Sequence, residues 1–220
     1  MRLLLNLGAV LWLAGCSSGP KYKIDDNSLA SVPLGEKQGM MAAQNEQNVA
    51  NEELRKAKAD LTDVDRTLDI ANNEYKASKL ALDTADLNKK AADASGDLTR
   101  KNQSAREIHV ADLGVKSCDK KVSFLEKKRK WIKECVDAAE DHIAAANAKY
   151  ELEKAKVVSS KGMKPTEDFN MTNFETESLD KMKRYSESQH TADKRKPDVD
   201  QLEYQWRAMD AEWTSARSQP

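Results

Sequence analysis

The chain is poor in the residues that interrupt helices and in the large side chains that fill broad cores. Its 220 residues include 8 glycines and 5 prolines, and aromatic residues make up only 5% of them. Acidic and basic residues nearly balance, at a formal net charge of -1, so no overall field favours binding to nucleic acid. Charged residues, by contrast, account for 33% of the chain. This composition suits long helices with narrow apolar seams better than a wide globular core.

Motifs typical of enzymes are also missing from the sequence. The three histidines, His109, His142 and His190, form no two-histidine zinc motif, and neither a glycine-rich phosphate loop nor a GxSxG turn occurs. Glu140, Asp141 and His142 are adjacent, so on a helix their side chains project around the axis, and we expect them at the surface. We therefore expect no enzymatic activity, no metal site and no cofactor.

No apolar run in the sequence is long enough to cross a membrane as a helix. The run at residues 3–13 is interrupted by Asn6 and falls short of the roughly 20 residues that a bilayer requires. Arg2 precedes this run, and Leu13-Ala14-Gly15-Cys16 ends it with small residues before a cysteine. This order of charged, apolar and small residues is typical of a secretion signal.

The segment Leu13-Ala14-Gly15-Cys16 resembles the lipobox of bacterial lipoprotein precursors, and the resemblance covers only this leading part of the chain. It implies that residues 1–15 are removed as a signal peptide and that Cys16 carries a diacylglycerol and an N-acyl group. Two or three acyl chains anchor a protein stably in a lipid bilayer. Ser17 resembles the residue that permits outer-membrane sorting, so we expect a lipid-anchored outer-membrane protein that faces the periplasm. An ordinary signal peptide followed by a chance cysteine is the alternative.

Residues 16–37 contain Gly, Pro, Ser and Asp without periodicity. They predict a flexible, solvated leash between the anchor and the body of the protein.

Residues 38–160 carry two seven-residue repeats. The first has a row of mostly large residues and a row of mostly alanine: Met40, Gln47, Leu54, Leu61, Leu68, Tyr75, Leu82 and Lys89 against Ala43, Ala50, Ala57, Val64, Ala71, Ser78, Ala85 and Ala92. The second starts in a new phase at Ile108, with Arg129 in one of its apolar rows. Two such segments separated by a short break predict an all-α fold, a long antiparallel helical hairpin or coiled coil.

The break between the two repeats locates the turn of the hairpin. Ser95-Gly96-Asp97 is the candidate turn, with the polar run up to Arg106 as a candidate tip, and a break at Gly114 is the alternative. Gly162 and Pro165 are expected to end the second arm. Lys154 lies near that end, where the helix dipole favours a positive charge.

After a linker at residues 161–175, residues 176–220 predict a short C-terminal segment of two helices. The first covers about residues 178–192, and Pro197 opens the second at about 198–216. The second carries a dense apolar stripe that includes Trp206 and Trp213.

Cys118 and Cys135 lie within one predicted helix. Seventeen residues separate them by roughly 25 Å, too far for a disulfide in a continuous helix. They are buried thiols, or they bridge two chains, or the helix is broken and they pair within the chain.

Phe124 and Trp131 lie one heptad apart beside the apolar rows of the second arm. Either the helix that carries Trp206 and Trp213 covers them, or these aromatic residues form an exposed docking patch for another envelope protein. The basic run at residues 127–130 predicts a solvent-exposed helix face. The charged Arg129 within a seam is typical of a residue that sets helix register.

The sequence thus favours a membrane-anchored envelope lipoprotein with a structural, scaffolding role. It would contact the bilayer through its acyl chains, and a second copy or another envelope protein through its helical faces. The alternative is an adaptor or accessory subunit of an envelope transport, secretion or motility complex.

Overall fold

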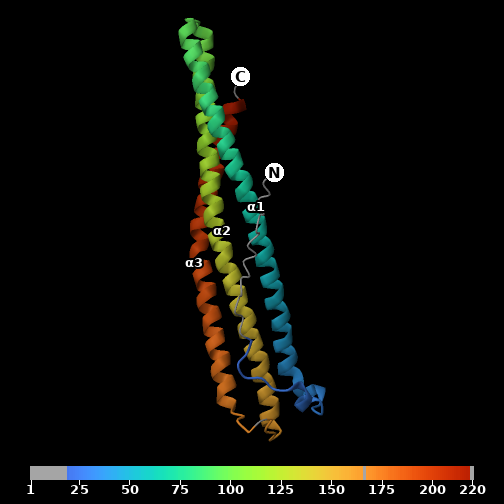
Figure 1. Ribbon diagram of the computed structural model, residues 1–220. Coiled ribbons are helices and arrows are strands. Elements are labelled where there is room, and N and C mark those ends of the chain that lie inside the picture. Colours follow the sequence, from blue (N-terminus) through green and yellow to red (C-terminus); the bar gives the residue numbers. More distant parts are fainter. Residues whose placement is uncertain (1–18, 166, 219–220) are drawn as a thin grey trace, which may run out of the picture.

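The computed structural model describes residues 19–165 and 167–218, which form three long helices (Figure 1). The helices are α1 (Gln38–Ser95), α2 (Leu98–Ser160) and α3 (Met171–Ser218), preceded by two short 3₁₀ helices, η1 (Asp26–Leu29) and η2 (Leu34–Lys37). The predicted all-α hairpin is confirmed: α1 and α2 run antiparallel along one another. Cys16 and the predicted signal peptide lie outside the described residues.

The turn of the hairpin lies at Gly96, as one of the two predicted positions placed it. Gly96 has φ of 72°, a left-handed conformation that glycine adopts without a Cβ clash. The Asp97 side chain accepts hydrogen bonds from the backbone N–H groups of Thr99 (2.8 Å) and Arg100 (3.3 Å), which caps α2. The polar run predicted as a candidate tip is helical, because this cap starts α2 at Leu98. The alternative break at Gly114 falls inside α2.

The alanine row of the first repeat forms the closest contact between α1 and α2. Ala43, Ala50 and Ala71 are fully buried, and such small residues let two helix backbones approach closely. Leu61 and Leu68 pack beside them against the core cluster formed with α2. Leu61 and Leu68 are thus used for packing inside the chain.

One continuous helix replaces the two short C-terminal helices that the sequence predicted. α3 begins at Met171, inside the expected linker, where the Asn170 side chain accepts a hydrogen bond from the Thr172 N–H (3.0 Å). Pro197 lies within the helix instead of opening a new one. Ala192 and Val199 are buried on either side of this proline, so packing against α2 outweighs the single backbone hydrogen bond that proline removes.

α2 lies between the other two helices. α1 and α3 each pack along it, whereas in the described residues the backbones of α1 and α3 do not come into contact. The N-terminal end of α1, the C-terminal end of α2 and the N-terminal end of α3 lie together at one end of the molecule, which we call the base (Figure 1). The hairpin tip at the other end extends beyond α3.

The segment before α1 is docked against the base, which corrects the prediction of a flexible leash for its described part, residues 19–37. Ile24, Leu29 and Val32 are 3–7% exposed and pack in one cluster with Val158 of α2 and Phe174 of α3. Three apolar side chains within nine residues help to bind this segment, although they follow no helical or strand period. Among the described residues, no helix is both long and apolar enough to span a membrane.

The two described cysteines are free thiols. α2 is unbroken between Cys118 and Cys135, so a bridge between them within the chain is geometrically excluded. Burial raises the pKa of both thiols, and nearby carboxylates, chiefly Asp193, add to the effect at Cys135.

We expect both thiols to react slowly with iodoacetamide at neutral pH, because only the thiolate attacks and its population is reduced. Cys118, 7% exposed, should react on the order of tenfold more slowly than the half-buried Cys135, and both rates should keep rising above pH 9. Mass spectrometry of the labelled peptides measures each site separately. Equal, fast labelling of both thiols at pH 7 would contradict their placement in the α2 interfaces.

Candidate functional site

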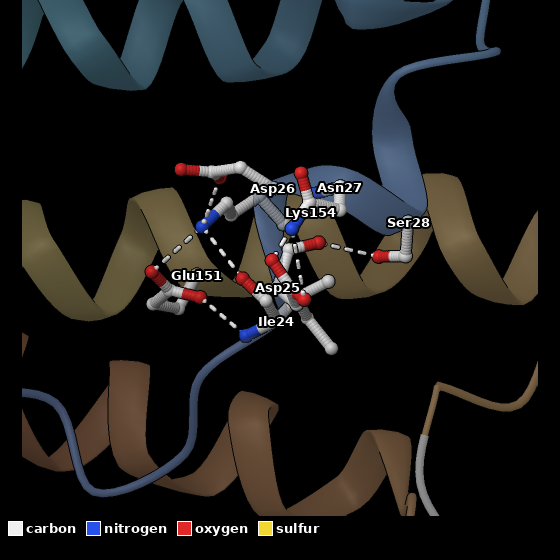
Figure 2. Close-up of polar contacts among 7 residues, drawn as sticks. All are labelled: Ile24, Asp25, Asp26, Asn27, Ser28, Glu151 and Lys154. Atoms are coloured by element: carbon white, nitrogen blue, oxygen red, sulfur yellow. Dashed lines mark hydrogen bonds and ion pairs between the residues drawn. The ribbon is translucent and has the colours of Figure 1, made fainter.

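A buried ion pair at the base joins the N-terminal segment to α2 (Figure 2). The Lys154 ammonium donates to the Ile24 carbonyl (2.9 Å) and to the Glu151 carboxylate (3.1 Å), and it pairs with Asp26 (2.7 Å). The second oxygen of Glu151 accepts the Ile24 N–H (2.8 Å). We call these four residues, Ile24, Asp26, Glu151 and Lys154, the base clamp.

Local sequence explains how the base clamp is presented. Glu151 and Lys154 are three residues apart on α2, so they share one helix face. On the other side, the Asp25 side chain accepts the Asn27 N–H (3.0 Å) and thereby caps η1. This cap turns the chain so that Ile24 and Asp26 both reach α2.

Two charged members of the base clamp, Lys154 and Glu151, are shielded from water, whereas the Asp26 side chain is 80% exposed. The Lys154 and Glu151 side chains are 5% and 11% exposed. Burial works against the charged ammonium, but hydrogen bonds to Asp26 and Glu151 outweigh it and raise the pKa of Lys154. The lysine is therefore charged at all physiological pH values, and removing it would leave the Glu151 carboxylate buried without a counter-ion.

A second set of contacts ties the same segment to α3. The Glu177 carboxylate accepts the backbone N–H groups of Lys21 (2.7 Å) and Tyr22 (3.2 Å). The Tyr22 ring lies against Phe174, with 5.7 Å between ring centroids. The segment thus contacts both α2 and α3, and no flexible stretch separates residue 21 from the helical bundle.

A groove of about 690 Å³ runs between α1 and α3, with α2 as its floor. Leu125, Ile132 and Cys135 line the floor, and Trp131 lies along it half-buried. Four acidic residues (Glu53, Asp60, Asp63 and Asp193) and two lysines (Lys56 and Lys128) also line the groove.

Bridging side chains lie near both ends of this groove. At the end nearer the base, His142 Nδ1 lies 2.6 Å from the Glu53 carboxylate, and its ring stacks on Tyr185 with 4.3 Å between centroids. Toward the tip, Lys121 of α2 pairs with Glu74 of α1 (2.6 Å). Lys121 also lies 5.8 Å from the centroid of the Trp206 ring.

His142 is buried, 8% exposed, which corrects its predicted place on the surface. The sequence could not show that Tyr185 of α3 would cover it. The three adjacent residues do project apart as predicted: Glu140 pairs with Lys58 (3.1 Å) and Asp141 with Arg184 (3.0 Å). In the described part of the chain, no three His, Cys, Asp or Glu side chains gather as metal ligands would.

The four aromatic residues predicted as docking candidates are divided between core and groove. Phe124 is 4% exposed and stacks on Trp206, with 5.6 Å between centroids, so α3 covers it. Trp213 lies against Gly114, where a side-chain Cβ would approach its indole nitrogen to 3.0 Å. Trp131 lines the groove described above, and Trp213 also lines a second groove of about 660 Å³ nearer the tip. The covering alternative therefore holds at Phe124, and docking stays a prediction for Trp131.

The basic run on α2 is engaged by neighbouring helices. Lys127 pairs with Asp198 of α3 (3.0 Å), and Arg129 pairs with Asp65 of α1. The Arg129 pair joins α1 and α2 at one register, consistent with the predicted role of a charged residue in the seam.

Sequence reasoning missed the base clamp entirely. Lys154 was noted only for its place near a helix end, and Ile24 and Asp26 lie in a segment without periodicity. In comparisons with protein-family models, curated proteins and solved structures, none matched this chain.

Proposed function

We propose that the protein is a structural envelope lipoprotein, anchored through Cys16, whose helical bundle is held rigidly at its base to the lipid anchor. The observation that carries this proposal is the docking of the N-terminal segment: Glu177 binds the chain at Lys21, only a few residues after the proposed lipobox, and the base clamp holds it again at Ile24. Cys16 precedes Gly19 by three residues, which span roughly 10 Å even when fully extended. The bundle would therefore sit next to the bilayer.

A rigid attachment suits a spacer or brace. α1 has 58 residues and extends roughly 85 Å from the base to the tip. Because the base is fixed near the anchor, the distance at which the tip works is set by helix length and by the tilt of the bundle. This is the property that a scaffold needs and that a flexible leash would remove.

An adaptor role is the second candidate, and the groove at Trp131 favours it. A half-buried indole beside an apolar floor is a typical hot-spot environment for a partner side chain. A photo-crosslinking residue in place of Trp131 should then capture one envelope protein in living cells. The same residue in place of Tyr204, which is 74% exposed on α3, is the control and should not. Capture of the same protein at both positions would count against the adaptor role.

The anchor is tested by replacing Cys16 with serine in the full chain. We expect the variant to lose acyl labelling and to leave the membrane fraction, because the thiol that would receive the lipid is absent. Cys135→Ser is the matched control and should keep both properties. A Cys16→Ser protein that is still acyl-labelled and membrane-bound would refute the lipoprotein proposal.

A further inference from the structure

The outer side of α1 carries three large apolar side chains that nothing in the described structure covers. Ile70, Leu80 and Leu87 are 50%, 66% and 65% exposed. They lie on the half of α1 nearer the hairpin tip. Each exposes far more apolar surface than the residues that α1 turns towards α2, such as Ala71 and Ala85.

These residues belong to a second heptad seam, here called the outer seam. Its members are alternately three and four residues apart and all exposed: Ile70, Asn73, Ala77, Leu80, Thr84 and Leu87. The residues that face α2 occupy other positions of the same helix, so α1 has a packed seam and an open one. A 3/4 spacing of apolar and small residues is the pattern by which one helix packs against another.

We infer that the outer seam binds the outer seam of a second copy of this chain, in antiparallel orientation. The pairing places Ile70 opposite Leu87 of the second copy, and Ala77 opposite its Leu80. In the other layer Asn73 meets Thr84 of the second copy, and every large apolar residue of the outer seam is covered. The arrangement has twofold symmetry, the commonest symmetry of homodimers.

Charges along one edge of the outer seam select this register. Asp69, Lys76, Asp83 and Lys90 follow one another at seven-residue spacing and alternate in sign, and all four are exposed. In the proposed register Asp69 lies opposite Lys90 of the second copy, and Lys76 opposite its Asp83. Symmetry doubles these contacts to four pairs of opposite charge. Lys90 also pairs with Asp86 within α1 (2.6 Å), an exposed contact that a partner can share.

The nearest competing arrangements bring like charges together. A shift by one heptad sets Lys76 against Lys90 of the second copy, and Asp83 against its own equivalent. A parallel, in-register pair sets Asp69 against Glu74. Like charges at such positions are destabilising and commonly determine helix orientation and register.

The dimer rests on the scaffold proposal for the tethering of its two ends, and it favours a brace that lies along the bilayer over an upright spacer, because both bases stay next to the membrane. The twofold axis falls about 40 residues along α1 from the base, so the two bases lie roughly 120 Å apart. Each copy contributes one base clamp, at opposite ends of the assembly.

Charge-reversal variants of the full chain test the inference. Sedimentation velocity in detergent measures the dissociation constant of the dimer for each variant. Lys76→Asp and Asp83→Lys each replace two attractive contacts with two repulsive ones, and each should raise the dissociation constant of the dimer on the order of 10- to 100-fold. The double variant Lys76→Asp/Asp83→Lys restores opposite charges and should recover the wild-type constant. Residues 76 and 83 lie two turns apart within one helix, so the rescue has no intramolecular explanation.

Two further variants complete the test. Leu87→Asp should abolish dimerisation, whereas Leu179→Asp, at a leucine that is 71% exposed on α3, should not. Two exposed changes on α2 are the charge-matched controls: Glu126→Lys for Asp83→Lys, and Lys130→Asp for Lys76→Asp. A monomeric wild-type chain, or a folded double variant that fails to recover dimerisation, would overturn the inference. Cys16→Ser protein should dimerise normally, so failure of the anchor and failure of the dimer are separate results.

Discussion

Replacing Lys154 with methionine is expected to release residues 19–37 from the base. Methionine fills similar space but leaves the Glu151 carboxylate buried without its counter-ion, and breaking a buried pair in this way costs about 3–5 kcal/mol. Undocking the segment returns Glu151 to water, so the penalty appears as local opening. Hydrogen exchange of the Ile24 N–H, which donates to Glu151 (2.8 Å), should accelerate on the order of 100-fold or more.

Two comparisons isolate the base clamp as the cause. Lys156→Met removes a lysine two residues away that pairs with Glu153 (2.6 Å) but is 51% exposed, and it should leave Ile24 exchange unchanged. Adding Glu151→Gln to Lys154→Met removes the stranded charge and should recover part of the protection. Unchanged Ile24 exchange in Lys154→Met would show that the ion pair does not hold the segment.

Truncating Phe124 to alanine is expected to destabilise the whole bundle. Its ring is 4% exposed and stacked on Trp206, so the change leaves a cavity between α2 and α3 and costs about 3–5 kcal/mol. For a chain of this length, that corresponds to a fall in the thermal midpoint of roughly 6–20 °C. Circular dichroism at 222 nm measures the midpoint.

The control for Phe124→Ala is Tyr204→Ala on α3. Tyr204 is 74% exposed, and removing its ring should change stability by less than about 0.5 kcal/mol. If Phe124→Ala melted within about 1 °C of wild type, α3 would not cover Phe124, and the exposed docking patch would be the better description of this face.

The hairpin could be predicted because its signal is local and repeated. Ala43, Ala50 and Ala71 are spaced at multiples of seven residues, and each of these buried alanines indicates the same face of α1 as the one that packs against α2. The turn needed only Gly96 and the capping Asp97. Features of this kind depend on neighbours within one or two helical turns, which a sequence displays directly.

The base clamp could not be predicted because its partners are distant and follow no period. The Ile24 N–H finds Glu151 across 127 residues, and Lys154 looks like many other helical lysines until Ile24 and Asp26 are placed beside it. The prediction of two short C-terminal helices in place of α3 was wrong for the opposite reason. The local rule at Pro197 was sound, but burial of Ala192 and Val199 against α2 outweighed it.

The long loop that the base clamp closes has a consequence for the order in which the protein acquires its structure. Ile24 and Glu151 are 127 residues apart in the sequence, and the entropic cost of closing a loop rises with its length. α1 and the turn at Gly96 can form from nearby residues before this loop closes, while Ile24, Leu29 and Val32 have no surface to cover them. Closure of the base is therefore a late event, and until then the folding chain exposes an apolar segment that a chaperone or protease can recognise.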